Sequence, residues 1–200
     1  MRFKAVISLC KKAKQVVLCD HKAVQWIGDG AALYAMYDMP EMGEGAICAV
    51  CDISDSQADK ILFKEFKGEP AGVSLELNCA DEVLLDQCDI ALKTGGKELL
   101  AFGTSTGMEF VEAAYLRPFG DVERDYLEVY ERRTPDGLPY FAVKTGILLL
   151  GIISPEHVIT DRFVKDISYL SRGCVTTLEN EKAKTAEEEA ADQMNMEEVS

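Results

Sequence analysis

The chain has 200 residues, of which 48% are hydrophobic, and a formal net charge of −14. This length suffices for one large domain or two small ones, and the hydrophobic fraction is enough for a buried core, which excludes a chain that is disordered throughout. The longest apolar run, residues 147–153, is interrupted by Gly151 and is much shorter than the roughly 18 residues that a membrane-spanning helix needs.

The N-terminus and the cysteines both favour a cytoplasmic protein. Residues 1–4 do not lead into the apolar segment of a secretory signal. Cysteine occurs seven times, an odd number, and mainly inside apolar patterns such as the one around Cys48 and Cys51. We therefore expect reduced thiols that pack as small hydrophobic side chains, without a disulfide framework.

The first 70 residues predict two helices and several strands. Apolar residues recur at helical spacing over residues 3–14, and short extended segments follow at 16–19, 23–27 and 31–37. Residues 45–53 form an apolar run that predicts a strand. Ser54 is a good N-cap for a second helix that would reach Lys67, and Gly68 would end it.

The middle of the chain predicts hairpins. Residues 73–77 are extended, and residues 80–92 are compatible with either helix or strand. Lys93-Thr94-Gly95-Gly96-Lys97 is a hairpin turn that leads into a strand at 98–102, and another strand follows at 108–113. The dipeptide Arg117-Pro118 then marks the most natural internal boundary.

The remaining residues predict three strands, one helix and a tail. Thr134-Pro135-Asp136-Gly137 is a turn between strands at 126–132 and 140–144, and 146–153 is a buried strand. Ser154 would cap a last helix that ends at Gly173. We expect one face of it to be buried through Ile159, Phe163, Ile167 and Leu170. Residues 179–200 carry eight acidic residues against two lysines, which predicts a disordered acidic tail.

These elements together predict an α+β fold with about ten short, mostly antiparallel strands and three or four helices. The predicted units are residues 1–118, a second, smaller α+β unit at 119–178 packed on the first, and the tail at 179–200.

Motifs for catalysis are weak in this chain. Cys48-Ala49-Val50-Cys51 is the one C-x-x-C sequence, but a redox pair needs a helix N-terminus and a zinc site needs further ligands. On the predicted strand the two cysteines would point to opposite faces. Core packing is the favoured interpretation, with a small thiol or redox enzyme as the alternative. The histidines, His21 and His157, have no evident catalytic partner, and no cofactor or metal site is predicted.

Basic residues show the one pattern that indicates a partner. Residues 1–14 contain five cations and no acid, and each of the three predicted helices presents a basic stripe. Ordinary solvated faces would explain each stripe alone, but together the stripes could line a nucleic-acid backbone, most simply that of DNA. The predicted binding residues are Lys4, Lys11, Lys14, Lys60, Lys64, Lys67, Arg162, Lys165 and Arg172.

The order of these elements resembles one domain of the DNA sliding clamps, the processivity factors of DNA polymerases. The likeness lies in the strand and helix at 45–67 and the strands around Gly95-Gly96-Lys97-Glu98-Leu99-Leu100, with a second round that begins after Pro118. The resemblance implies basic helices facing DNA. The acidic residues within 80–92 depart from that pattern.

Two segments are similar to uncharacterised proteins of prophages and mobile elements in anaerobic Gram-positive bacteria. They are Gln25-Trp26-Ile27-Gly28-Asp29-Gly30 and the stretch that begins Tyr130-Glu131-Arg132-Arg133. The leading hypothesis is therefore a non-catalytic interaction protein, clamp-like and associated with DNA or phage replication machinery. A phage structural or assembly protein, with protein partners or self-association, is a further alternative.

Overall fold

The computed structural model describes the backbone of residues 1–197 and the side chains of this range other than 124 and 187–197. The chain forms two compact units, Met1–His157 and Val158–Ser200. The described part has 11 strands in two sheets, and most strand pairs are antiparallel, which confirms the predicted α+β class. None of its helices has the length and apolar character needed to cross a membrane.

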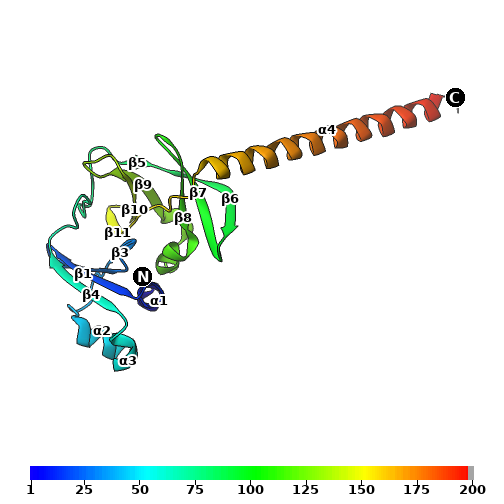
Figure 1. Cartoon of the computed structure of the whole chain (residues 1–200). Coiled ribbons are helices and arrows are strands. Elements are labelled where there is room, and N and C mark those ends of the chain that lie inside the picture. Colours follow the sequence, from blue (N-terminus) through cyan, green and yellow to red (C-terminus); the bar gives the residue numbers. More distant parts are fainter. Residues whose placement is uncertain (198–200) are drawn as a thin grey trace. The chain divides into compact units, whose positions relative to one another are not determined.

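The larger sheet has eight strands in the order β4-β1-β2-β3-β11-β10-β9-β5 (Figure 1). All neighbours are antiparallel except β1 and β4, which are parallel, with Val16 opposite Phe63. The strands are β1 (Gln15–His21), β2 (Val24–Gly28), β3 (Ala32–Ala35), β4 (Leu62–Lys67), β5 (Val83–Leu84), β9 (Glu128–Arg133), β10 (Pro139–Thr145) and β11 (Leu148–Ile153).

The smaller sheet is a three-stranded meander of β6 (Asp86–Thr94), β7 (Lys97–Thr104) and β8 (Gly107–Glu112). Gly95 and Gly96 form the tight turn between β6 and β7, and both have positive φ, at 55° and 78°. A Cβ at either position would meet nothing within 4 Å. Glycine is therefore favoured at these positions because of the left-handed backbone conformation, and not because a side chain would collide with a neighbour.

The helices are short in the first unit and long in the second. The first unit contains α1 (Phe3–Ala13), α2 (Glu44–Val50), α3 (Asp55–Ala58) and two 3-10 segments, η1 (Ala113–Phe119) and η2 (Arg124–Tyr126). The second unit contains α4 (Asp161–Glu197). Helix α1 buries Val6, Ile7, Leu9 and Cys10. It ends at Ala13, because its C-cap Lys14 has a left-handed conformation with φ of 55°.

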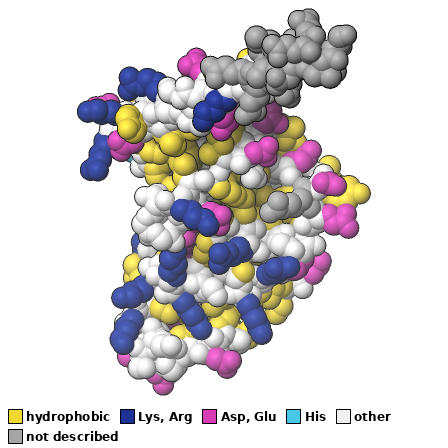
Figure 2. Space-filling view, turned by 90° about the vertical axis from the view of Figure 1, so that its right-hand side faces the viewer, with side chains coloured by type: hydrophobic (Ala, Val, Ile, Leu, Met, Phe, Trp, Pro, Cys, Tyr) yellow, Lys and Arg dark blue, Asp and Glu magenta, His cyan; other side chains and the backbone are white. Residues whose placement is uncertain are grey.

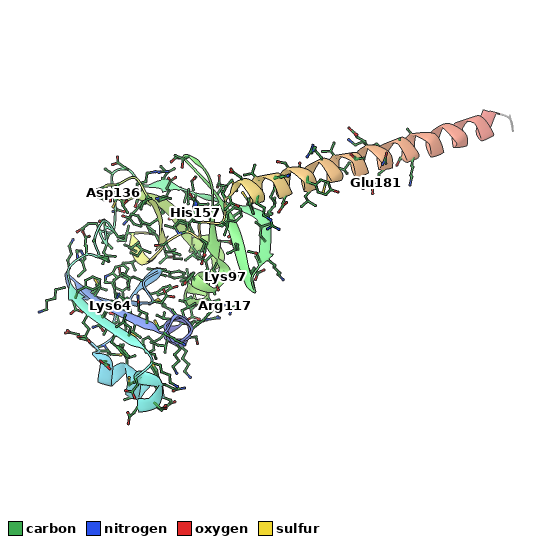
Figure 3. The ribbon with its side chains drawn as sticks, in the orientation of Figure 1. Lys64, Lys97, Arg117, Asp136, His157 and Glu181 are labelled. Carbon is green, nitrogen blue, oxygen red and sulfur yellow. The ribbon has the colours of Figure 1, made fainter. Side chains whose placement is uncertain are left out.

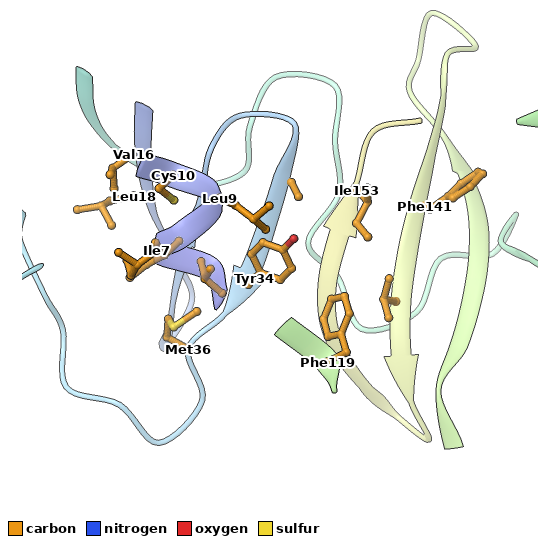
Figure 4. Packing of buried hydrophobic residues seen from close by; sticks show 14 of the residues in the cluster. Ile7, Leu9, Cys10, Val16, Leu18, Tyr34, Met36, Phe119, Phe141 and Ile153 are labelled. Atoms are coloured by element: carbon orange, nitrogen blue, oxygen red, sulfur yellow. The ribbon is translucent and has the colours of Figure 1, made fainter. Parts of the chain in front are cut away.

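The core occupies both faces of the larger sheet, because side chains alternate along each strand. On one face Leu18 and Tyr34 pack against α1, η1 and the smaller sheet (Figure 4). Gly151 is required here, because a Cβ would lie 2.7 Å from Cζ of Phe119, which contacts the Tyr34 ring. On the other face Trp26 packs with Leu75 of the segment 70–82.

Two predicted elements around residue 50 were wrong. The expected strand at 45–53 is helix α2, in which Ile47 is buried. An apolar run of this length fits either structure, so periodicity could not decide. Ser54 does cap a helix, with a capping box to Gln57, but that helix ends at Ala58 instead of Lys67. The following residues form β4, because pairing with the edge of β1 satisfies their backbone groups.

The internal boundary predicted at Arg117-Pro118 does not separate two sheets. Strands from both sides of it share the larger sheet, since β3 pairs with β11 through Tyr34 and Gly151. The undecided segment 80–92 contains β5 and most of β6, so it is extended. Ser154 is not a helix cap. Its N–H donates a hydrogen bond to the Ala31 carbonyl, which extends the pairing of β11 with β3 by one residue.

The helix of the second unit differs from the last helix that the sequence predicts. Its helix begins at Asp161, and the face predicted to be buried contains exposed Ile159, Ile167 and Leu170. The tail predicted to be disordered from residue 179 continues this helix to Glu197, and its alanine, glutamate and lysine content favours helix. Residues 198–200 lie outside the described part.

Candidate functional site

Helix α1 presents a row of exposed cations. Lys4, Lys11, Lys12 and Lys14 are all exposed, and the helix has no acid in its first turn. Lys11 Nζ donates to the carbonyl of Cys51 at 2.9 Å. Within the described part Lys4 and Lys14 have no side-chain partner. The helix is therefore positive on the side that faces away from the core.

A groove of about 690 Å³ runs between α1, the β6–β7 turn and η1. Helix α1 contributes Ala5, Ser8, Leu9 and Lys12, whose spacing places them on one face. The remaining lining residues come from the turn, the end of β8 and η1. They are Lys93, Thr94, Gly95, Gly96, Lys97, Glu98, Glu112, Ala113, Ala114 and Arg117.

The floor of the groove holds a buried carboxylate between two lysines. The Glu112 side chain is 7% exposed, with Oε1 2.7 Å from Lys12 Nζ and Oε2 3.4 Å from Lys97 Nζ. Burial alone would raise the pKa of Glu112, but the two lysines outweigh it and hold this pKa below its usual value. Lys97 also pairs with Glu156, and these contacts raise its pKa. Both groups are therefore charged at neutral pH.

Lys93 and Arg117 are the cations of the groove that have no internal partner. Both are exposed, and neither forms an ion pair or side-chain hydrogen bond within the described residues. The other two lysines of the groove are neutralised by Glu112 and Glu156, while exposed Glu98 adds one opposing charge. Lys93 and Arg117 therefore remain available to an external anion.

The figures show how these charges are distributed. Figure 2 shows Lys and Arg side chains gathered over one face of a protein that is acidic overall. Figure 3 labels Lys97 and Arg117, which lie near each other beside α1, whereas Lys64 lies apart from them on β4. The cations that line the groove come from α1, the β6–β7 turn and η1.

The predicted binding residues do not form three helical stripes. Lys4 and Lys11 lie on α1, and Lys14 is its C-cap. Lys64 and Lys67 lie on strand β4, and Lys60 is in the turn before it, so the second basic helix was wrong. Arg162, Lys165 and Arg172 lie on α4 of the second unit, where they are exposed. Within the first unit, the predicted binding residues that lie on a helix are therefore those of the α1 group.

Sequence reasoning missed the residues that complete the groove. Lys93 and Lys97 flank the Gly95-Gly96 turn that was predicted correctly, and Arg117 lies in a segment interpreted only as a boundary. The paired lysines around two glycines were a usable signal, because a turn projects such side chains outward together. Their proximity to α1 depends on contacts between distant segments, which a pattern of residues does not contain.

The C-x-x-C pair lies on helix α2 and not on a strand, so the expected geometry was wrong. Cys48 is in the last turn of α2 and Cys51 is its C-cap, and residues three apart share a helix face. Burial is the main reason that the pKa of each thiol is raised. A reactive thiolate is favoured at a helix N-terminus, which is the opposite end. This arrangement disfavours redox chemistry.

One group of described side chains has the composition of a metal site. His21, Glu69 and Glu76 place their ligand atoms within 4.8 Å of one another. This group lies at the end of β1 and of the parallel strand β4. It does not contribute to the groove.

The comparisons with known proteins identify no relative. No protein-family description matches the chain, no curated protein matches it, and no solved structure matches the fold.

Proposed function

We propose that this protein is a non-catalytic binding protein that holds a nucleic-acid backbone in the groove between α1 and the β6–β7 turn. The observation that carries the proposal is the pair of unpartnered cations, Lys93 and Arg117, beside the exposed lysines of α1. Phosphate groups are the anions that such arrays bind most often, through charge and without sequence readout.

The lining of the groove supports a phosphate ligand. The groove has a volume of about 690 Å³, and one side is the backbone of a glycine turn without side chains. A phosphate can therefore approach the main chain of Gly95 and Gly96 closely, and Lys93 and Arg117 line the same groove. Lys4 and Lys11 of α1 extend the positive surface along the same helix.

The acidic charge of the whole chain restricts this binding to the groove. A net charge of −14 repels a polyanion from most of the surface, so that an anion is attracted only where cations are concentrated. We expect modest affinity that decreases steeply with salt. A ring-shaped clamp is not part of this proposal, because it relied on a second basic helix and Lys64 and Lys67 lie on a strand.

A charge-reversal pair tests the proposal directly. The double variant Lys93→Glu with Arg117→Glu removes both free cations, and neither has a partner whose loss would destabilise the fold. The matched control, Lys60→Glu with Lys64→Glu, changes the net charge equally outside the groove. Binding is measured by fluorescence anisotropy with short labelled DNA duplexes and single strands over a range of salt concentrations.

The groove variant should bind DNA at least about 10-fold more weakly. The negative slope of log association constant against log salt concentration should become shallower by about 2, one for each lost phosphate contact. The control should change the affinity only slightly. Equal losses in both variants would show that the net charge matters and the groove does not. If the unmodified protein does not bind either form of DNA at low salt, the proposal is wrong.

A further inference from the structure

Two neighbouring strands end at the same edge of the larger sheet and bring two potential ligands together. His21 is the last residue of β1, and Glu69 follows β4, which runs parallel to β1. The Gly68 N–H bonds to the Asp20 carbonyl at 2.8 Å, and the φ of Gly68 is 88°. This turn directs the chain back across the end of β1, so that Glu69 faces His21.

The third side chain comes from the segment 70–82, which covers the second face of the sheet. Glu69 Oε1 accepts hydrogen bonds from the Leu75 N–H at 2.7 Å and from the Ser74 hydroxyl at 3.2 Å. The Glu76 carbonyl accepts a hydrogen bond from the buried guanidinium of Arg132 at 2.9 Å. These hydrogen bonds hold the main chain of residues 74–76 in place, so that Glu76 lies beside Glu69.

The imidazole has a free nitrogen in this position. Nε2 of His21 lies 3.8 Å from Glu69 Oε1 and 3.6 Å from Glu76 Oε1. This nitrogen has less than 1 Å² of exposed surface and no hydrogen-bond partner. A buried polar atom without a partner is costly, and both carboxylates lie beyond hydrogen-bond distance of it. The site therefore has a buried imidazole nitrogen close to two carboxylates, and neither carboxylate satisfies it.

The spacing suits a cation at the centre of the three atoms. Zinc binds histidine nitrogen at about 2.0–2.1 Å and carboxylate oxygen at about 2.0–2.2 Å, so a nitrogen and an oxygen that share one tetrahedral ion lie roughly 3.3–3.5 Å apart. The 3.6 and 3.8 Å separations are close to these values. The glutamates are 35% and 46% exposed, which leaves one side open for water ligands.

We propose that His21, Glu69 and Glu76 bind a divalent first-row transition-metal cation, such as Zn²⁺, Co²⁺ or Mn²⁺, through Nε2 of His21 and one carboxylate oxygen of each glutamate. One imidazole and two carboxylates are a ligand set that such ions accept. A bound cation would link the ends of β1 and β4 to the segment 70–82. This inference does not depend on the proposed nucleic-acid binding.

Lys22 is the competing cation at this site. Its Nζ lies 2.6 Å from Glu76 Oε2, and this hydrogen bond is the main reason that the pKa of Glu76 is lowered. Lys22 occupies the oxygen that points away from His21, so Oε1 remains available. Its positive charge opposes a second cation nearby, and removing it should therefore strengthen metal binding.

The test is a titration of the purified full chain with Co²⁺, followed by visible absorption and by calorimetry. Binding should have a stoichiometry of one ion per chain. His21→Gln and Glu76→Gln should each weaken it at least about 100-fold, more than is typical for loss of an outer-shell partner. Lys22→Met should strengthen it several-fold. Circular dichroism without metal verifies that each variant folds.

The cysteines provide the necessary control, because thiolates also bind Co²⁺ and add intense charge-transfer absorption. The double variant Cys48→Ser with Cys51→Ser should leave the affinity and the spectrum unchanged. Binding that disappears in this variant, or that persists unchanged in folded His21→Gln and Glu76→Gln, would overturn the proposal. Absence of binding at millimolar Co²⁺ would also overturn it.

Discussion

Glu82 is the residue whose replacement should most clearly destabilise the first unit. It receives hydrogen bonds from two buried cations, Arg132 through Nε and an Nη at 2.9 and 2.6 Å, and Lys144 through Nζ at 2.7 Å. The side chains of Arg132 and Lys144 are 1% and 4% exposed. Glu82→Gln keeps the shape but removes the charge that balances both cations.

We expect Glu82→Gln to lower the free energy of unfolding by about 3–5 kcal/mol at pH 7, the usual cost of breaking a buried ion pair from one side. The amide NH₂ of glutamine would also face donors and not acceptors. Urea denaturation measures the change. The matched control is Glu41→Gln, an exposed glutamate, which should cost less than about 0.5 kcal/mol.

The pH dependence gives a second test of the same network. Burial alone would raise the pKa of Glu82, but the hydrogen bonds from Lys144 and Arg132 outweigh it, so the pKa is lowered from its ordinary 4.5. A group with a lowered folded pKa stabilises the fold above its unfolded pKa, and this contribution is lost as the pH falls through the folded value. The difference between Glu82→Gln and the unmodified protein should therefore decrease below about pH 4.5. A cost under about 1 kcal/mol at pH 7, or one that does not change with pH, would refute this reasoning.

Three further predictions concern packing and are measured by thermal or urea denaturation. Phe119→Ala removes a ring that is 1% exposed and should cost about 3–5 kcal/mol. Gly28→Ala should cost about 1–3 kcal/mol or more, because its Cβ would lie 1.7 Å from the Ala32 carbonyl oxygen, whereas Gly103→Ala, which meets nothing within 4 Å, should be neutral or slightly stabilising. Ile167→Ala in α4 should lower the free energy of unfolding by less than about 1 kcal/mol, since this side chain is exposed. A larger decrease would indicate that this helix face is buried, as the sequence predicts.

Local signals predicted the elements that depend on local chemistry. The turn at Gly95-Gly96, the cap at Ser54 and the helix over residues 3–14 all rest on backbone conformations or spacings that a few residues determine. The failures are of another kind. The helix expected from Ser54 to Lys67 is wrong in its second half, because the sequence does not show that the edge of β1 is available to pair with residues 62–67.

The candidate site shows the same limit more strongly. The cations of α1 were visible as a run without acids, but Glu112, Lys97 and Arg117 join them only through tertiary packing. His21 appeared to lack partners because Glu69 and Glu76 lie about 50 residues away in the chain. Both clusters form where segments distant in sequence meet, so neither could be assembled from spacing alone.

The pairing of β3 with β11 has a consequence for synthesis on the ribosome. The Tyr37 hydroxyl and the Leu149 carbonyl, which join these regions, are 112 residues apart in the chain. At about 5–20 residues per second, β3 is made roughly 6 to 22 s before its neighbour. During that interval the backbone edge of β3 that later pairs with β11 has no partner and can pair with other nascent chains. All four residues of β3 are buried in the folded protein, so their side chains also lack their final contacts. Chaperone protection during translation should therefore increase the yield of this protein more than protection after release.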